Sequence, residues 1–247
     1  MDLHSDGVVP APDLKILAPL RDAVTARSAS GTAVARAAEI LRRGVVTGVL
    51  RAGTRLPEEA LAAELEISRN SLRAAFDELE QEHLVIRQRH RGVQVVVPDA
   101  ATMHEIYRHR LALEGAALRW PEHEFREPAV VRMHEAVRRG RAAREAQDVA
   151  GMAGANDAFH RAVVSLSGSS RQLELMDRAL AEVRLIFHTL DENPVFHSPW
   201  VERNASILER VEQQRDVEAA DLIGTYLSDS RRNILKQWEG PDGEIVR

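Results

Sequence analysis

Two arginines and three short polar residues stand close together at the start of one predicted helix. Ser68 can cap that helix, so Arg69, Asn70 and Ser71 fall in its first turn and Arg73 follows one turn later. Guanidinium, amide and hydroxyl groups are the side-chain groups that hydrogen-bond to base edges and phosphates. The pattern therefore predicts a helix end that can enter the major groove of double-stranded DNA.

A second basic cluster follows a short distance along the chain. It consists of Arg87, Arg89, His90 and Arg91, with Gly92 directly after it. The cluster lies between two stretches of alternating apolar residues, which is typical of a hairpin with a basic tip. Such charges can also protect the edge of a sheet. Two basic clusters in one small part of a chain with a net charge of −5 nevertheless favour DNA binding.

Asn156 and His160 are the residues best placed for ligand chemistry in the second half of the chain. They are four residues apart, so they share one face of a helix and can converge on one bound group. A lone interior histidine is more often a core residue that bonds to a neighbour. The sequence contains no Gly-x-Ser-x-Gly, no glycine-rich phosphate loop and no His-Glu-x-x-His. Binding is therefore expected rather than catalysis.

The composition excludes several classes of protein. The 247 residues include no cysteine, so disulfides and thiolate metal sites are excluded, and any DNA contact must come from a local patch. No apolar run approaches the roughly 20 residues that span a bilayer, and the N-terminus lacks a secretory signal. The expectation is a cytoplasmic protein of two domains, without a membrane partner.

The first basic cluster belongs to a helix-turn-helix pattern between Leu56 and Leu84. Apolar residues recur at helical spacing on both sides of a short interruption at residues 66–68, and another helix is predicted over 33–47. Together with the hairpin, these elements predict a winged helix-turn-helix domain over residues 32–98. Residues 1–31, rich in proline and small residues, are expected to form a mostly flexible lead-in with room for one short helix.

Beyond Pro98 the alternating pattern does not return. Helical patterns separated by breaks with turn residues cover 102–118, 128–147, 149–166, 172–190, 197–214 and 217–238. Residues 100–238 are therefore expected to be an all-helical bundle, followed by a tail over 239–247. The predicted fold class is mainly α, with an N-terminal winged helix-turn-helix and its small β-hairpin joined to this bundle.

Residues from about 33 to 98 resemble the N-terminal domain of GntR-family transcription regulators. The shared pattern is a turn with Pro or Gly, a Leu-Ala-Leu helix, the pair Ser68-Arg69, the following Arg73 and a basic wing with Gly92. The resemblance implies that Arg69, Arg73 and Gly92 contact DNA.

The sequence departs from this family pattern inside the predicted DNA-binding helix. Asn70-Ser71 stand where Thr-Pro or Thr-Thr is usual, and Phe76 replaces a usual leucine. These departures concern base preference rather than the way the domain docks on DNA.

Residues from about 100 to 236 resemble the FCD effector domain of the FadR subfamily of these regulators. The resemblance is carried by the segment from Asn156 to His160, by Leu166-Ser167-Gly168, and by the segment from Leu111 to Glu114 with Arg110 before it. Many FCD domains bind a divalent metal through an Asp or Asn, a His four residues later and two more histidines. That metal in turn holds a small carboxylate effector.

The resemblance places this ligand set at Asn156, His160, Asn204 and Tyr226. The last two positions are not histidines, and a neutral amide is a poorer zinc ligand than imidazole. One interpretation is that the metal has been lost and that these four side chains bind an organic effector directly.

In that interpretation Arg110 or Arg184 meets a carboxylate of the effector. A second interpretation keeps a weakened, zinc-like site in which His188 or His197 completes the set begun by Asn156 and His160. A third is a packed polar core that binds no ligand.

The combined expectation is a ligand-responsive transcription regulator, a repressor, that binds a near-palindromic operator as a homodimer. A dimer is expected because one such domain makes too few contacts for tight specific binding. Two alternatives remain: a DNA-binding protein whose helical domain only dimerises, and a metal or small-molecule enzyme with an appended helix-turn-helix. The second is weak because no catalytic set accompanies His160.

Overall fold

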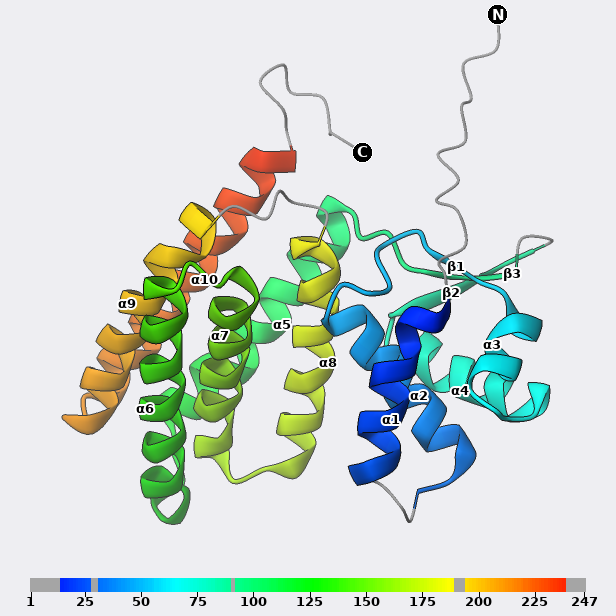
Figure 1. Ribbon diagram of the computed structural model, residues 1–247. Helices are drawn as coiled ribbons and strands as arrows, with labels where there is room; N and C mark the ends of the chain where they lie inside the picture. The colour runs from blue at the N-terminus through cyan, green and yellow to red at the C-terminus, as the bar shows by residue number, and fades with distance from the viewer. Residues whose placement is uncertain (1–13, 28–30, 90–91, 189–193, 239–247) are drawn as a thin grey trace, which may run out of the picture. The chain divides into compact units, whose positions relative to one another are not determined.

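The computed structural model describes residues 14–27, 31–89, 92–188 and 194–238 (Figure 1). The contacts divide the chain into two units. The first contains Met1–Pro98 and Ala181–Thr189, and the second contains Asp99–Leu180 and Leu190–Arg247.

The first unit combines short helices with a small antiparallel sheet. Its elements are η1 (Leu14–Leu17), α1 (Ala18–Arg27), α2 (Ala33–Val46), β1 (Arg55–Leu56), α3 (Glu58–Glu64), α4 (Arg69–Gln81), β2 (Val85–Gln88) and β3 (Gly92–Val95). The strand order is β1-β3-β2. The predicted hairpin is thus present, and β1 adds a third strand through the pairing of Leu56 with Val93.

Helix α4 packs on α2 and α3 through one apolar face. Leu72, Phe76 and Leu79 of α4 belong to the buried core, together with Leu41 of α2 and Leu61 of α3. This is the helix-turn-helix core that the spacing of apolar residues predicts.

A bidentate ion pair fixes the far end of α4. Arg42 of α2 donates from Nε and Nη2 to the two carboxylate oxygens of Glu82, each at 2.7 Å.

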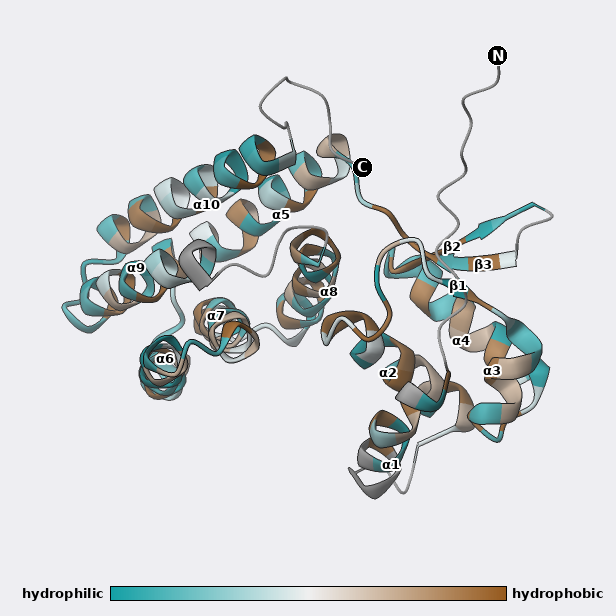
Figure 2. Ribbon diagram, turned by 45° about the horizontal axis from the view of Figure 1, so that its top comes forward, coloured by the Kyte–Doolittle hydropathy of each residue, from teal (hydrophilic) through white to brown (hydrophobic). Residues whose placement is uncertain are grey.

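Hydrophobic and hydrophilic residues alternate along α2 and α10 in Figure 2, as expected for helices with one buried face.

Residues 14–27 of the expected lead-in form η1 and α1, in agreement with the short helix that the sequence allows there. Leu17 and Val24 are 0% and 2% exposed and belong to the core of the first unit. Arg21 donates to the backbone carbonyl of Glu64 at 2.9 Å, which ties α1 to the end of α3. Pro19 lies in the first turn of α1, where a helix tolerates proline. Residues 1–13 and 28–30 lie outside the described residues.

The second unit is helical, as predicted. Its elements are α5 (Ala100–Arg119), α6 (His123–Glu145), α7 (Val149–Val164), η2 (Ser165–Ser167), the first part of α8 (Ser170–Phe187), α9 (Pro194–Glu212) and α10 (Asp216–Trp238). Side-chain caps start two of them, because Asp99 accepts from the Thr102 amide and Asp148 from the Gly151 amide. The predicted tail at 239–247 lies outside the described residues.

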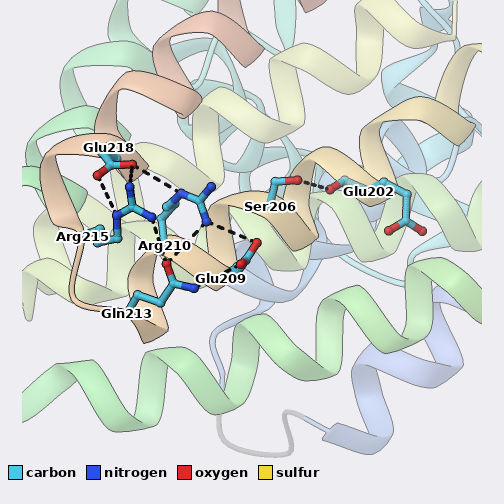
Figure 3. A network of polar contacts seen from close by, with 7 residues as sticks. All are labelled: Glu202, Ser206, Glu209, Arg210, Gln213, Arg215 and Glu218. Atoms are coloured by element: carbon cyan, nitrogen blue, oxygen red, sulfur yellow. Dashed lines mark hydrogen bonds and ion pairs between the residues drawn. The ribbon is translucent and has the colours of Figure 1, made fainter.

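The corner between α9 and α10 is held by a network of exposed polar contacts (Figure 3). Arg210 and Arg215 both pair with Glu218, at 3.5 and 2.6 Å, and Arg215 also donates to Gln213 at 3.3 Å. Each exposed pair adds only about 0–1 kcal/mol, but together they restrain the turn. The two helices that meet there carry Asn204 and Tyr226.

Candidate DNA-binding surface and buried polar cluster

The start of α4 has the geometry that the sequence predicts. The Ser68 side chain accepts a hydrogen bond from the Ser71 amide at 3.0 Å, and the two hydroxyl oxygens lie 2.9 Å apart. Because Leu72 is buried on the opposite face, Arg69 and Arg73 project outward, each with a side chain that is 59% exposed. Asn70 is exposed too, whereas the Ser71 hydroxyl is engaged with the cap.

Each of these two arginines contacts a carboxylate from the start of α3. Arg73 donates from Nε to Glu58 at 2.8 Å, and Arg69 donates from Nη2 to Glu59. The basic surface of α4 is therefore partly neutralised within its own domain.

The wing is the hairpin of β2 and β3, which contacts α4 near its base and has Gly92 next to its tip. Gly92 has φ of +79°, a conformation that L side chains rarely adopt, although a Cβ there would meet no atom within 4 Å. Arg89 is exposed, and Arg91 lies outside the described residues.

Arg87 joins the wing to α4. Its guanidinium pairs with Asp77 and Glu80 of α4, and it donates to the backbone carbonyl of Arg73 at 3.1 Å. These contacts give Arg87 a structural role that the sequence did not suggest.

A cluster of buried charged and polar side chains lies in the second unit. Arg110 donates from Nε to Glu114 at 2.9 Å, and the other carboxylate oxygen lies 2.6 Å from His160 Nδ1. Glu114 and His160 are 0% exposed and Arg110 is 2% exposed. Glu114 is a member of the cluster that was not predicted as a site residue, although its spacing of four residues from Arg110 is a signal for such a pair.

The charge states of Glu114 and His160 depend on two opposing effects, which are desolvation by burial and pairing with neighbouring groups. Burial alone would raise the pKa of Glu114, but Arg110 and His160 outweigh it and hold that pKa below its ordinary value. Burial lowers the pKa of His160, and Glu114 offsets only part of this effect. His160 is therefore neutral near pH 7, with its proton on Nδ1 toward Glu114 and a lone pair on Nε2.

Asn156 connects two further helices to this cluster. Its side-chain oxygen accepts from Asn204 Nδ2 at 2.9 Å and from the Tyr226 hydroxyl at 2.8 Å. The Tyr226 ring packs edge-on against His160 at 4.9 Å and lies 4.7 Å from the Trp200 ring. Asn156, His160, Asn204 and Tyr226 are thus brought together, as the sequence predicts.

Three buried polar atoms of this cluster have no hydrogen-bond partner among the described residues. They are Arg110 Nη2, a donor, and His160 Nε2 and Asn204 Oδ1, which are acceptors in the states assigned above. A small cavity of about 10 Å³ adjoins Asn156, His197 and Asn204. That volume suits one water molecule. The cluster therefore has unused hydrogen-bonding capacity, and the cavity beside Asn156 and Asn204 has room for one water molecule.

The cluster does not fit a zinc site. Within the described ranges, no group of three or more His, Cys, Asp or Glu is placed to hold a metal ion. The Asn156 oxygen already accepts two hydrogen bonds, and His160 offers a single nitrogen, whereas zinc sites use several imidazole, thiolate or carboxylate ligands.

The remaining candidates divide between the two units. His197 lines the small cavity beside Asn156. His188 and Arg184 lie in residues 181–189, which group with the first unit, where His188 contacts the Val46 carbonyl at 3.3 Å.

Comparison with known proteins matches both units. The family described as "Bacterial regulatory proteins, gntR family" matches residues 33–95, and the FCD domain family matches residues 105–229. The chain belongs to the GntR family of bacterial regulatory proteins and carries an FCD domain. It is thus a DNA-binding transcription regulator rather than an enzyme.

Individual relatives agree with this assignment. The crystal structure of a transcriptional regulator, GntR, from Rhodococcus sp. RHA1 is 35% identical, covers 82% of this chain and 97% of its own, and has a TM-score of 0.74. An HTH-type transcriptional regulator from the TAR-I ttuE-ttuC' intergenic region of Agrobacterium vitis is 28% identical over 60% of this chain and 88% of its own length. McbR/YncC of E. coli shares the fold, with a TM-score of 0.70 at 17% identity, over 84% of this chain and 99% of its own.

In the part of the chain that the structure describes, no helix has both the length and the apolar character needed to cross a bilayer.

Proposed function

We propose that this regulator is a ligand-responsive repressor that binds a near-palindromic operator as a homodimer. Repression is the usual mode of action among the regulators that the sequence resembles. In this proposal the helical domain binds a small organic effector, and effector binding changes the affinity for the operator.

The exposed arginines of α4 carry the DNA part of the proposal. Arg69 and Arg73 project from the first turns of a capped helix, where side chains of a helix-turn-helix meet base edges. Arg89, Arg91 and the backbone at Gly92 would contact phosphate or the minor groove. Arg87 would act mainly by holding the wing against α4.

Replacing both arginines tests this part. We expect Arg69→Ala plus Arg73→Ala to reduce operator affinity at least about 30-fold, because each well-placed base contact provides about 1–3 kcal/mol. Fluorescence anisotropy with an operator duplex at several salt concentrations measures the loss. The salt dependence should also become less steep, by a log-log slope of about 0.9 for each phosphate that the variant no longer binds.

A matched control removes the same charge from the other unit. Arg138→Ala plus Arg139→Ala takes two exposed arginines from α6, and operator affinity should stay within about twofold because the proposal gives these two residues no contact with DNA. Equal affinity of the Arg69/Arg73 variant and the parent would contradict the assignment.

The buried polar atoms that have no hydrogen-bond partner among the described residues support effector binding by the helical domain. Arg110 Nη2 would bind an anionic oxygen, whereas His160 Nε2 and Asn204 Oδ1 would each accept a hydrogen bond. A small carboxylate that also bears hydroxyl or amine groups satisfies all three. This effector would need no metal, because the donor set does not fit one.

The small cavity favours a second candidate, in which the helical domain only dimerises. A space for one water cannot hold an organic acid, so an effector that enters beside Asn156 and Asn204 would require this side of the cluster to open, for example by movement of Tyr226 or Trp200.

Thermal shift and calorimetry with a panel of organic acids and divalent metals distinguish the two candidates. We expect a hydroxycarboxylate or amino acid to raise the unfolding temperature of the parent but not of His160→Gln. Metal salts alone should have no effect. A flat response across the panel would favour the dimerisation-only candidate.

A groove on the second unit supports the homodimer. The groove has a volume of about 730 Å³, with small residues Ala112, Gly115, Ala116, Ala220 and Gly224 along it. The exposed side chains of Leu111 and Trp120 border it, at 46% and 72% exposure.

Charged side chains of both signs line this groove, namely Arg119, Asp221, Asp229 and Arg232. Under two-fold symmetry a carboxylate of one copy can face a guanidinium of the other. A second copy of the chain is therefore the occupant that we propose for this groove.

A further inference from the structure

Two neighbouring carboxylates face the arginines that we assign to DNA. Glu58 and Glu59 form the first turn of α3, and they contact Arg73 and Arg69 of α4, respectively. A carboxylate close to a phosphate backbone is unfavourable for DNA binding in general. The geometry of each pair indicates what these two residues do instead.

Glu58 contacts Arg73 through the nitrogen that base recognition does not need. The bond runs from Arg73 Nε to Glu58 Oε2 at 2.8 Å. Both terminal nitrogens of Arg73 then remain available for the two acceptors of a guanine edge, O6 and N7. The Glu58 side chain is 31% exposed, so it is well enough packed to restrict the guanidinium plane.

Glu59 contacts Arg69 through a terminal nitrogen. The bond runs from Arg69 Nη2 to Glu59, whose side chain is 82% exposed. Nη2 carries two hydrogens, so this bond occupies one of the donors that Arg69 could otherwise place on a base or phosphate. Glu59 and DNA thus compete for this guanidinium, and the competing carboxylate also offsets its charge.

We propose that Glu58 and Glu59 set the DNA selectivity of this regulator in different ways. Glu58 is a positioning residue that aims Arg73 at one base, and Glu59 lowers the affinity of Arg69 for DNA of any sequence. This inference rests on the proposed contacts of Arg69 and Arg73 with DNA.

The experiment compares selective with general binding. The parent first selects its preferred duplex from a random pool. Dissociation constants are then measured for that duplex and for a mixed-sequence duplex, with the parent, Glu58→Gln, Glu59→Gln and Glu78→Gln. Glu78 is an exposed residue of α4, so Glu78→Gln matches the change in charge.

For Glu58→Gln we expect the ratio of the affinity for the selected duplex to the affinity for the mixed-sequence duplex to fall about fivefold. This fall is part of the discrimination between bases that one bidentate arginine–guanine contact provides. Glu58→Asp keeps the charge but draws the carboxylate back, and it should lose a similar part of the ratio. In the Arg73→Ala background, Glu58→Gln should leave the ratio unchanged, since its effect acts through Arg73. Unchanged unfolding temperatures would show that the variants fold.

For Glu59→Gln we expect affinity for both duplexes to rise about two- to threefold beyond the Glu78→Gln control, with an unchanged ratio, because one competitor for a phosphate-binding cation is gone.

An unaltered ratio in Glu58→Gln, or the same fall in the Arg73→Ala background, would overturn the role of Glu58. Equal effects of Glu59→Gln and Glu78→Gln would overturn that of Glu59. A parent that enriches no sequence and binds neither duplex would instead overturn the DNA contacts of Arg69 and Arg73, and this inference with them.

Discussion

Arg110 and Glu114 form a fully buried ion pair on one helix of the FCD domain. The pair is joined to His160, so one carboxylate satisfies two partners, and one guanidinium nitrogen remains unpaired among the described residues. A buried ion pair is weak evidence for stability, because desolvation of the two charges offsets their attraction. Its presence in the core is better explained by the binding role that we propose for Arg110.

Removing one partner of this pair should be costly. We expect Glu114→Ala to lower the free energy of unfolding by about 3–5 kcal/mol, because the Arg110 charge stays buried without compensation. The double variant Arg110→Met plus Glu114→Leu should recover most or all of that loss, because replacing a buried ion pair by apolar residues of similar volume is often neutral or stabilising. Urea unfolding followed by tryptophan fluorescence is the suitable measurement, since Trp120, Trp200 and Trp238 all belong to the second unit. A double variant no more stable than Glu114→Ala would contradict this explanation.

At the scale of elements, the start of α4 depends on one cap. Ser68 satisfies the Ser71 amide, and the residue two positions before it, Glu66, has φ of +55°. A non-glycine residue in this conformation is uncommon, so the turn relies on its surroundings for its shape. Ile67 helps by donating from its amide to the Ala62 carbonyl at 3.0 Å.

Loss of the cap should loosen the first turn of the helix. We expect Ser68→Ala to lower the free energy of unfolding of the DNA-binding domain by about 1 kcal/mol, and Ser68→Thr to change it by only a few tenths. Hydrogen exchange at the Ser71 amide, measured by NMR, should quicken in Ser68→Ala and stay slow in Ser68→Thr. Equal exchange in both variants would mean that the cap contributes nothing.

Elements with a clear period could be predicted from the sequence, and those set by tertiary contacts could not. The apolar spacing around Leu72, Phe76 and Leu79 correctly gave the buried face of α4, and the spacing of Asn156 and His160 gave a shared face. Strand β1 has only two residues and exists because it pairs with β3, so no local pattern marks it. The contacts of Arg87 with α4 likewise depend on packing between elements that sequence spacing does not encode.

At the scale of the whole molecule, the proposed second copy is the feature most open to test. A Cβ at Gly115 or Gly224 would lie 3.8 Å from the Leu111 side chain, an ordinary contact, so each glycine accepts a cysteine. The chain contains no other cysteine, so any cross-link must join the introduced residues.

We expect Gly224→Cys to give a covalent dimer with a short bismaleimide at micromolar concentration. Val131→Cys, at a residue of α6 that is 62% exposed, should give little, because only a shared face keeps two cysteines close. Sedimentation of the parent reports the oligomeric state separately. A sedimenting dimer that Gly224→Cys fails to cross-link would place the interface elsewhere, whereas a monomer would contradict the homodimer itself.

Helix α1 decides which fragment of this regulator can be studied alone. The family match begins at residue 33, and a fragment cut there would lack Leu17 and Val24, which are buried against the helix-turn-helix core. Burial of each such side chain is worth about 1.5–3 kcal/mol, and small domains have only about 5–15 kcal/mol of stability in total. A DNA-binding fragment should therefore begin before residue 14, and weak DNA binding by a shorter fragment would reflect its unfolding rather than its recognition chemistry.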